Sequence, residues 1–207
     1  MLTKQHEILL QSLGDFPDPK PHLEQYPTPP SVAVDMLNRA RGDIAGKVVF
    51  DLGCGTGMLS VGAALAGADM VVGVDVDSDA LKTAKRNVAF AEEVFGPLRI
   101  YLVRARIPQF HFRADTVVMN PPFGMRRKGS DREFLLAAME GANVVWTLLG
   151  HDSDPFVRRL AEDMGFAWER VRDYPLTLRR TMRFHRRDRR TVRVSLYRLE
   201  RVRFSTQ

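Results

Sequence analysis

Short apolar runs alternate along this chain with longer segments whose apolar residues recur at helical spacing. In the segment that follows Ser78, for example, Leu81, Ala84 and Val88 fall on one helical face, and Gly96 ends the pattern. Strands are predicted at 48–51, 70–74, 100–103, 116–119, 143–148 and 166–171, and helices at 58–66, 78–95 and 154–164, with a further helix capped by Asp131. Strands that alternate with helices imply a parallel sheet covered on both faces.

The C-terminal part of the chain departs from this alternation. Residues 191–199 have period two, with Val192, Val194 and Leu196 on one face, and no helical segment precedes them. A strand reached without a crossover helix implies an antiparallel hairpin, in which 174–184 is either the first arm or an inserted loop. The predicted fold class is therefore α/β, three-layer and Rossmann-like, with a mostly parallel seven-stranded sheet and an antiparallel C-terminal hairpin.

The N-terminal 45 residues have a different pattern. A short helix is predicted over 3–13, and a proline-rich segment over 15–21 follows it. Pro29 and Pro30 preset the backbone for a helix over 31–41, which Ser31 or Thr28 is placed to cap. The residues between, 25–28, are either a linker or a lid over a ligand, and the pattern alone does not choose between these.

Length and composition limit the class of protein. The 207 residues suffice for one domain, 1–207, with 44% hydrophobic and 27% charged residues. We expect no membrane span, because no apolar run reaches roughly 18 residues, and no signal peptide at the N-terminus. One cysteine, Cys54, excludes an internal disulfide and a cysteine-based zinc site. We therefore expect no metal and a reducing, cytoplasmic location.

The charge is positive and unevenly distributed. The formal net charge is +6, and residues 179–203 contain eleven arginines and one histidine. A solvated arginine-rich surface would also have this composition. Because the arginines gather at one end instead of alternating with acids, we favour a polyanionic partner, namely nucleic acid.

A glycine-rich turn follows the first predicted strand. Gly53, Gly55 and Gly57 come directly after Asp51-Leu52, and such a turn lets backbone N–H groups approach a ligand closely. Asp75 ends the next strand, 18 residues beyond Gly57, where nucleotide-binding α/β sheets place a carboxylate for ribose hydroxyls. The turn lacks the Lys-Ser/Thr of a P-loop, which counts against a triphosphate. Asp51 is placed to accept an ammonium group.

The segment Asn120-Pro121-Pro122-Phe123 follows the fourth strand. Its prolines stiffen the backbone at the carboxyl end of the sheet, where α/β ligand sites lie. A planar amine there would donate one hydrogen to the Asn120 side chain and one to the Pro121 carbonyl, with Phe123 as a flat face for its ring. A rigid turn with a core phenylalanine is the alternative.

The glycine turn resembles motif I of class I methyltransferases that use S-adenosylmethionine, and Asn-Pro-Pro-Phe resembles the motif of amino-methyltransferases. Over nearly the whole chain, the sequence resembles the methyltransferase-like protein 5 family and its archaeal relatives. The shared motifs are Leu23-Glu24-Gln25-Tyr26-Pro27-Thr28, Asp51-Leu52-Gly53-Cys54-Gly55, Asn120-Pro121-Pro122-Phe123-Gly124, Gly129-Ser130-Asp131 and Phe184-His185-Arg186-Arg187. This family comprises N6-adenosine methyltransferases of small-subunit ribosomal RNA.

The resemblance implies a role for each matching residue. Asn120, Pro121, Pro122 and Phe123 would hold the target adenine. The implied cofactor site comprises Gln25, Tyr26, Thr28, Asp51, Gly53, Gly55, Thr56, Gly57, Met58, Asp75, Val76, Arg106 and Ile107. In this interpretation residues 1–45 form a helical lead-in and a cofactor lid.

The resemblance also implies macromolecular partners. RNA would contact a basic loop or hairpin over 174–190, where we favour a phosphate or packing contact over a general base for His185. The implied RNA-binding residues are Arg126, Arg127, Lys128, Arg183, His185, Arg186 and Arg187. Family members pair with a small zinc-binding activator protein, which would dock along an edge strand near 99–104.

One departure from the family leaves rival functions open. After the third strand the family usually has an acidic residue facing the cofactor's adenine, and this chain has Arg104-Ala105-Arg106-Ile107 instead. A methyltransferase fold that only binds RNA is therefore one rival. Methylation of a protein glutamine is another, although those enzymes usually have tyrosine after the two prolines. DNA adenine is a weaker rival, since 207 residues leave no space for a separate target-recognition domain.

Overall fold

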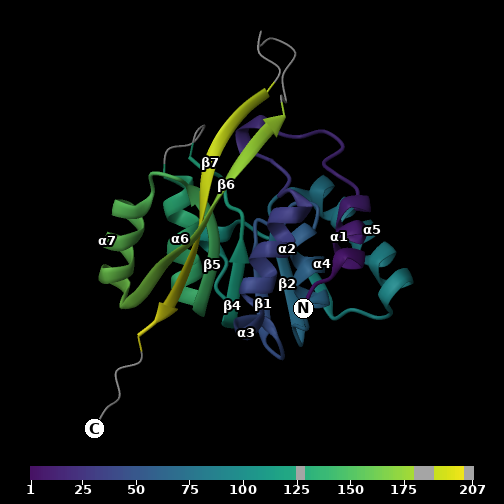
Figure 1. The fold of residues 1–207 in the computed structure, drawn as a ribbon, viewed down its shortest axis with the longest axis horizontal. Coiled ribbons are helices and arrows are strands. Elements are labelled where there is room, and N and C mark those ends of the chain that lie inside the picture. The colour runs from purple at the N-terminus through teal and green to yellow at the C-terminus, as the bar shows by residue number, and fades with distance from the viewer. Residues whose placement is uncertain (125–128, 180–188, 203–207) are drawn as a thin grey trace.

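The computed structural model describes residues 1–124, 129–179 and 189–202. Its centre is one sheet formed by β1 (Val48–Leu52), β2 (Met70–Asp75), β3 (Ile100–Arg104), β4 (Ala114–Met119), β5 (Ala142–Gly150), β6 (Phe166–Arg179) and β7 (Arg189–Arg201). The strand order is β3-β2-β1-β4-β5-β7-β6 (Figure 1). Strands β1 to β5 are parallel, and β7 is antiparallel to both β5 and β6. The predicted fold class is confirmed.

The strand order reverses between β1 and β4. From β1 the chain proceeds outward to β2 and β3 on one side, and then crosses to β4 and β5 on the other. Val49 pairs with Val71 of β2 and with Thr116 of β4, so the carboxyl ends of these three strands lie at one edge. Ligands of open α/β sheets bind at such a switch point.

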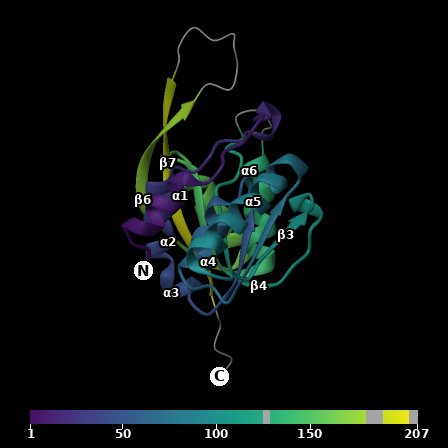
Figure 2. The same cartoon turned by 90° about the vertical axis from the view of Figure 1, so that its right-hand side faces the viewer.

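Helices cover both faces of the sheet. They are α1 (Lys4–Ser12), α2 (Pro30–Arg39), α3 (Arg41–Ile44), α4 (Met58–Leu65), α5 (Ser78–Phe95), α6 (Ser130–Gly141) and α7 (Asp154–Met164), with short 3-10 helices at Pro21–Leu23 and Ile107–Gln109. Helices α1 to α5 lie on one face, whereas α6 and α7 lie on the other (Figures 1 and 2). Neighbouring strand residues alternate between the two cores, as Val49 and Phe50 do in β1.

The hairpin is longer than its apolar pattern predicts. Strand β6 continues from the predicted end at Val171 to Arg179, so residues 174–179 form the first arm and not an inserted loop. A register shift between Arg170 and Arg172 moves the inward side chains from the α6–α7 core, which holds Phe166, to the α2 core, which holds Tyr174. Because the inward face changes at this shift, the apolar residues of β6 do not follow one period-two pattern. The sequence therefore predicts that the strand ends at Val171.

Two predicted helix caps are wrong. The residue before α2 is Pro29, which has no capping side chain, and neither Ser31 nor Thr28 caps that helix. The residue before α6 is Gly129 in a left-handed conformation, and Asp131 lies inside the first turn. Gly129 adopts this left-handed conformation without strain, and α6 begins without a side-chain cap.

No helix in the described part of the chain combines the length and apolar character needed to cross a membrane.

Candidate active site

The glycine turn connects β1 to α4 in a backbone conformation that favours glycine. Gly53, Gly55 and Gly57 have φ angles of 71°, 53° and 86°. A Cβ atom on Gly55 would lie 2.6 Å from Cζ of Phe16, and one on Gly53 would lie 3.0 Å from Cε1 of Phe134. Two aromatic rings therefore pack closely against the turn, and a side chain at Gly53 or Gly55 would press against one of them.

Asp75 at the end of β2 holds this turn in place. One of its carboxylate oxygens accepts a hydrogen bond from the Gly55 N–H at 2.8 Å, and the other accepts one from the Asp77 N–H at 2.8 Å. Burial raises the pKa of Asp75 and outweighs the opposing effect of these backbone donors. Asp75 also lines the adjacent cavity, and each of its oxygens has lone-pair capacity beyond the one backbone donor.

Asp51 at the end of β1 is fully enclosed. Its carboxylate accepts a hydrogen bond from the Ser60 hydroxyl at 2.6 Å, and the residue is 1% exposed. Burial raises its pKa to about 7. A cation brought close to Asp51 would favour the charged carboxylate and lower this pKa.

A cavity of about 780 Å³ opens at the carboxyl edge of β1, β2 and β4. The residues from the predicted site that line it are Gln25, Tyr26, Gly53, Gly55, Asp75, Val76, Arg106, Ile107, Asn120 and Pro122. A smaller adjoining cavity of about 40 Å³ is lined by Tyr26, Thr28, Asp51, Gly53, Gly55, Thr56, Met58 and Asn120. The structure thus brings the predicted cofactor residues and the β4 tip to one place.

Three predicted site residues do not line these two cavities. Gly57 precedes α4, and a Cβ atom there would lie 3.2 Å from Cβ of Ala84. Pro121 is buried, and the Phe123 ring packs against the core on the α2 face. In this structure Phe123 therefore presents no ring to the cavity.

Asn120 lies at the wall that both cavities share. Its side-chain Nδ2 donates a hydrogen bond to the Thr28 hydroxyl at 3.0 Å. Its Oδ1 is buried and has no hydrogen-bond partner among the residues that the structure describes. Most buried acceptors have a hydrogen-bond partner. The Asn120 oxygen, at the end of β4, has none among the described residues and can accept a hydrogen bond from a ligand.

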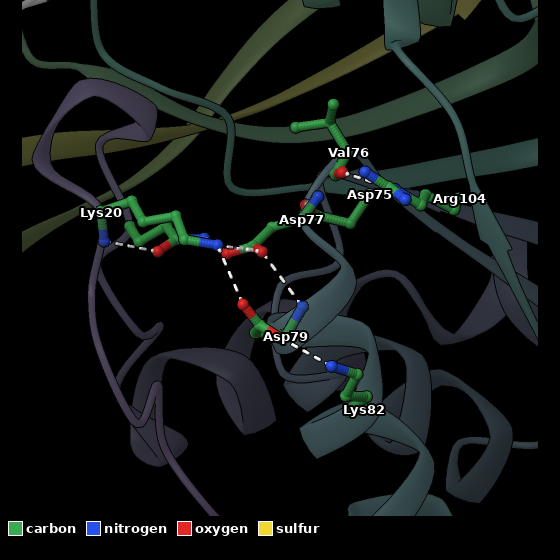
Figure 3. Close-up of polar contacts among 8 residues, drawn as sticks. Lys20, Asp75, Val76, Asp77, Asp79, Lys82 and Arg104 are labelled. Carbon is green, nitrogen blue, oxygen red and sulfur yellow. Dashed lines mark hydrogen bonds and ion pairs between the residues drawn. The ribbon is translucent and has the colours of Figure 1, made fainter.

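The segment before α2 forms part of the cavity wall. Gln25 Nε2 donates to Asp77 Oδ2 at 2.7 Å, and Gln25 Oε1 accepts from the Lys20 N–H at 2.7 Å. Lys20 Nζ contacts Asp77 and lies 3.3 Å from Asp79 (Figure 3). These bonds fasten the lead-in to the loop after β2.

The sequence analysis does not assign several residues that line the cavity or hold its wall, and four of these matter for its shape. Phe16, Lys20, Asp77 and Phe134 line the cavity or hold its wall. Asp77 directly precedes α5 and accepts from the Asp79 N–H, so an N-cap signal was available for it. No sequence signal pairs Lys20 with Asp77, because 57 positions separate them.

The predicted RNA-binding residues lie outside the described part of the chain. They are Arg126, Arg127, Lys128, Arg183, His185, Arg186 and Arg187. The hairpin base is described: pairing of β7 with β5 ends at Val194, and beyond it β7 pairs with β6 alone. The described part of the hairpin therefore extends beyond the carboxyl ends of the parallel strands, on the side of the sheet where the cavity opens (Figure 1).

Strand β3 forms one edge of the sheet, as predicted. It pairs with β2 and has no strand on its other side in the described sheet. Tyr101 is 54% exposed at this edge.

Comparison with known proteins identifies the chain's relatives. A family model described as ribosomal protein L11 methyltransferase matches residues 31–121, which contain the glycine turn and Asp75 but end before Phe123. The crystal structure of a candidate RNA methyltransferase from Pyrococcus horikoshii superposes over 100% of both chains with TM-score 0.86 and 36% identity. Magnesium protoporphyrin IX methyltransferase from Synechocystis with bound SAM has TM-score 0.60, covering 83% of this chain and 77% of its own, and at 19% identity shows the fold alone.

A curated relative extends the match to nearly the full length. The rRNA N(6)-adenosine-methyltransferase Mettl5 of Drosophila melanogaster is 35% identical over 94% of this chain and 94% of its own. This chain therefore belongs to the Mettl5 family of rRNA N(6)-adenosine-methyltransferases.

Proposed function

We propose that this protein transfers a methyl group from S-adenosylmethionine to N6 of an adenosine in structured RNA, specifically small-subunit ribosomal RNA. One observation carries the proposal: Asn120 lines the cavity that the glycine turn also lines, and its buried Oδ1 has no hydrogen-bond partner among the described residues. An acceptor in this position suits an exocyclic amine, which has hydrogens to donate.

The residues around the cavity fit the cofactor. Gly53 and Gly55 line the cavity at a turn that has no space for a Cβ atom, and Met58 lies nearby for the methionine part. Asp75 offers acceptors to ribose hydroxyls, and Asp51 offers a carboxylate to the ammonium group. When bound, this cofactor supplies an electrophilic methyl group on a positively charged sulfur.

Adenine of the cofactor would be held without a carboxylate. Arg106 is exposed at the cavity rim, whereas Ile107 is 4% exposed and lines the wall. We assign the adenine contact to the apolar Ile107 side chain and neighbouring backbone groups. Apolar contact and backbone hydrogen bonds are the usual way in which a pocket orients a ring.

The β4 tip would orient the target amine. Asn120 Oδ1 would accept one amine hydrogen and the Pro121 carbonyl, which does not line the cavity in this structure, would accept the other, which would turn the nitrogen lone pair out of conjugation with the ring. Thr28 holds the other end of the Asn120 amide. Positioning of this kind lowers the barrier without a strong base, because the reacting methyl group is already activated.

RNA would reach the cavity beside the C-terminal hairpin, at the cost of a few kcal/mol for unstacking the target base. The formal net charge of +6 favours phosphate contacts, whose number sets the salt dependence of binding. A small zinc-binding activator would add a strand along β3, where Tyr101 is exposed. With ribosomal RNA as the substrate, the location that we propose is the cytoplasm.

Labelled methyl transfer to three substrates tests the proposal. We expect label in ribosomal RNA and none in duplex DNA or in a release factor with an acceptor glutamine. Label in the release factor would replace the RNA function with protein methylation. Calorimetry with S-adenosylmethionine tests the alternative of a methyltransferase fold that only binds RNA. A protein that binds RNA but not the cofactor would be a binding module and not an enzyme.

A further inference from the structure

The carboxylate of Asp51 has one side-chain partner among the described residues, Ser60 in the first turn of α4. The Ser60 hydroxyl donates to Asp51 Oδ2 at 2.6 Å, and Ser60 is 0% and Asp51 1% exposed. This distance is typical of a hydroxyl that donates to a charged carboxylate, a bond about twice as strong as one between neutral groups. Because β1 fixes the backbone of Asp51, a bond to one carboxylate oxygen sets the direction of the other.

The surroundings of Ser60 direct its hydroxyl toward Asp51. A serine inside a helix often bonds to the carbonyl four residues earlier. For Ser60 that carbonyl belongs to Thr56, and it accepts instead from Asn87 Nδ2 at 2.8 Å. The hydroxyl also faces β2, where a Cβ atom on Gly73 would lie 2.9 Å from Ser60 Oγ. It is therefore enclosed between α4, β1 and β2, with Asp51 as its acceptor.

The other carboxylate oxygen, Oδ1, has no side-chain donor among the described residues. Asp51 lines the small cavity of about 40 Å³ that adjoins the main one, and it is the one acid among the described residues around that space. A water-sized group needs roughly 10–15 Å³, so the small cavity admits an ammonium group but no aromatic ring. An ammonium group is costly to bury unless a carboxylate pairs with it. The small cavity therefore fits the ammonium group of the cofactor.

We propose that Ser60 is a positioning residue for cofactor binding, which holds Asp51 Oδ2 so that Oδ1 faces the small cavity and accepts from the ammonium group of S-adenosylmethionine. The inference rests on the proposed function and adds the residue that prepares the ammonium contact. Ser60 lines neither cavity, so in this account it touches no part of the cofactor and acts through Asp51 alone. Without the hydroxyl, the carboxylate has no side chain that orients it before the cofactor binds.

Two ligands that differ only in the amino group isolate this contact. They are S-adenosylhomocysteine and S-adenosyl-4-thiobutyric acid, the same molecule without its amino group. By calorimetry we expect wild type to bind the first at least about tenfold more tightly, the size of a hydrogen bond between charged groups. Ser60→Ala should shrink this ratio roughly three- to fivefold and change the Kd of the deaminated ligand less than about twofold. An unchanged ratio, or equal weakening of both ligands, would overturn the proposal.

Two further variants separate action through Asp51 from a general structural effect. In an Asp51→Asn background, Ser60→Ala should change the ratio of the two affinities no further, because the charge that it positions is absent. Ser12→Ala is the matched control, since Ser12 Oγ makes the ordinary bond to a carbonyl four residues earlier in α1. It should leave both affinities unchanged. A full effect of Ser60→Ala in the Asp51→Asn background would contradict a positioning role.

The titration of Asp51 keeps the inference testable without a ligand. Burial raises the pKa of Asp51 to about 7, the Ser60 hydroxyl opposes this shift, and the charge of Asp75 adds to it. Burial also raises the pKa of the neighbouring Cys54 thiol, which therefore stays neutral in this range.

Loss of the Ser60 hydroxyl should raise the pKa of Asp51 further, because the charged form loses a donor. The ¹³C carboxyl signal of labelled aspartate measures this, and Asp51→Asn assigns it. An Asp51 titration that is the same in Ser60→Ala and in wild type would overturn the anchor. Wild-type protein that binds neither ligand would instead overturn the proposed function, while the titration still decides the anchor.

Discussion

The ends of β1 and β4 face the same cavity but differ in how their polar groups are satisfied. At the end of β1, Asp51 accepts from Ser60, and the Gly55 N–H donates to Asp75. At the end of β4, Asn120 Oδ1 has no partner within the described residues. Each carboxylate on the cofactor side therefore has a donor within the protein, whereas the acceptor on the target side has none among the described residues, and the target amine would supply it.

The largest expected effect comes from removing the unpaired acceptor. Asn120→Ala should lower turnover at least about a hundredfold, because the amine loses the acceptor that orients its lone pair. Cofactor affinity should change little, since the glycine turn and Asp75 are untouched. Steady-state methyl transfer and calorimetry measure the two quantities.

Asn143→Ala is the matched control for this variant. Asn143 is exposed near the amino end of β5, away from the carboxyl ends of the strands, and lines a separate cavity. Its loss should leave both turnover and affinity unchanged. An Asn120→Ala variant that loses cofactor affinity as strongly as turnover would remove the distinction between the two strand ends.

The next effect concerns the glycine turn. Gly55→Ala should weaken cofactor binding by roughly tenfold or more, because its Cβ atom would lie 2.6 Å from the Phe16 ring beside the cavity. Gly46→Ala is the control: it shares a positive φ of 69° but meets no atom within 4 Å. Both variants should lose about 1 kcal/mol of stability from backbone strain, and only Gly55→Ala should lose affinity. Equal affinities for the two variants would show that the turn does not shape the cofactor site.

The smallest effect is a pH dependence of stability from Asp51. Burial raises its folded-state pKa to about 7, above the ordinary value of 3.8, so its contribution is present at low pH and is lost as pH rises through 7. Between pH 6 and pH 8 this loss amounts to about 1 kcal/mol. Asp51→Asn, which cannot titrate, should flatten the slope by that amount in urea unfolding. An unaltered slope would mean that Asp51 is already charged at pH 6.

The cofactor half of the site could be predicted from sequence because its signals are local. The glycines, Asp51 and Asp75 lie at the ends of two successive strands, and parallel pairing brings those ends together. The strand directions also followed, since helices between the strands require parallel crossovers and the helix-free end requires a hairpin.

The contacts that segment 20–28 makes with the rest of the site could not be predicted, because they join segments that are distant in the sequence. Thr28 has the local features of a helix cap, yet its hydroxyl serves Asn120 and leaves α2 uncapped. Lys20 and Gln25 meet at Asp77 only after the lead-in folds across the sheet edge. The change of inward face in β6 could not be predicted for a related reason. A β-bulge is defined by the pairing of one strand with its neighbour, and the pairing of β6 with β7 is not visible in the sequence.

The most direct test of the central claim is a crystal structure with S-adenosylhomocysteine and an RNA fragment that contains the methylated adenosine site. The account predicts an adenine whose N6 lies within hydrogen-bond distance of Asn120 Oδ1 and of the Pro121 carbonyl. An adenine held by other groups, with Asn120 Oδ1 still unpaired, would contradict it.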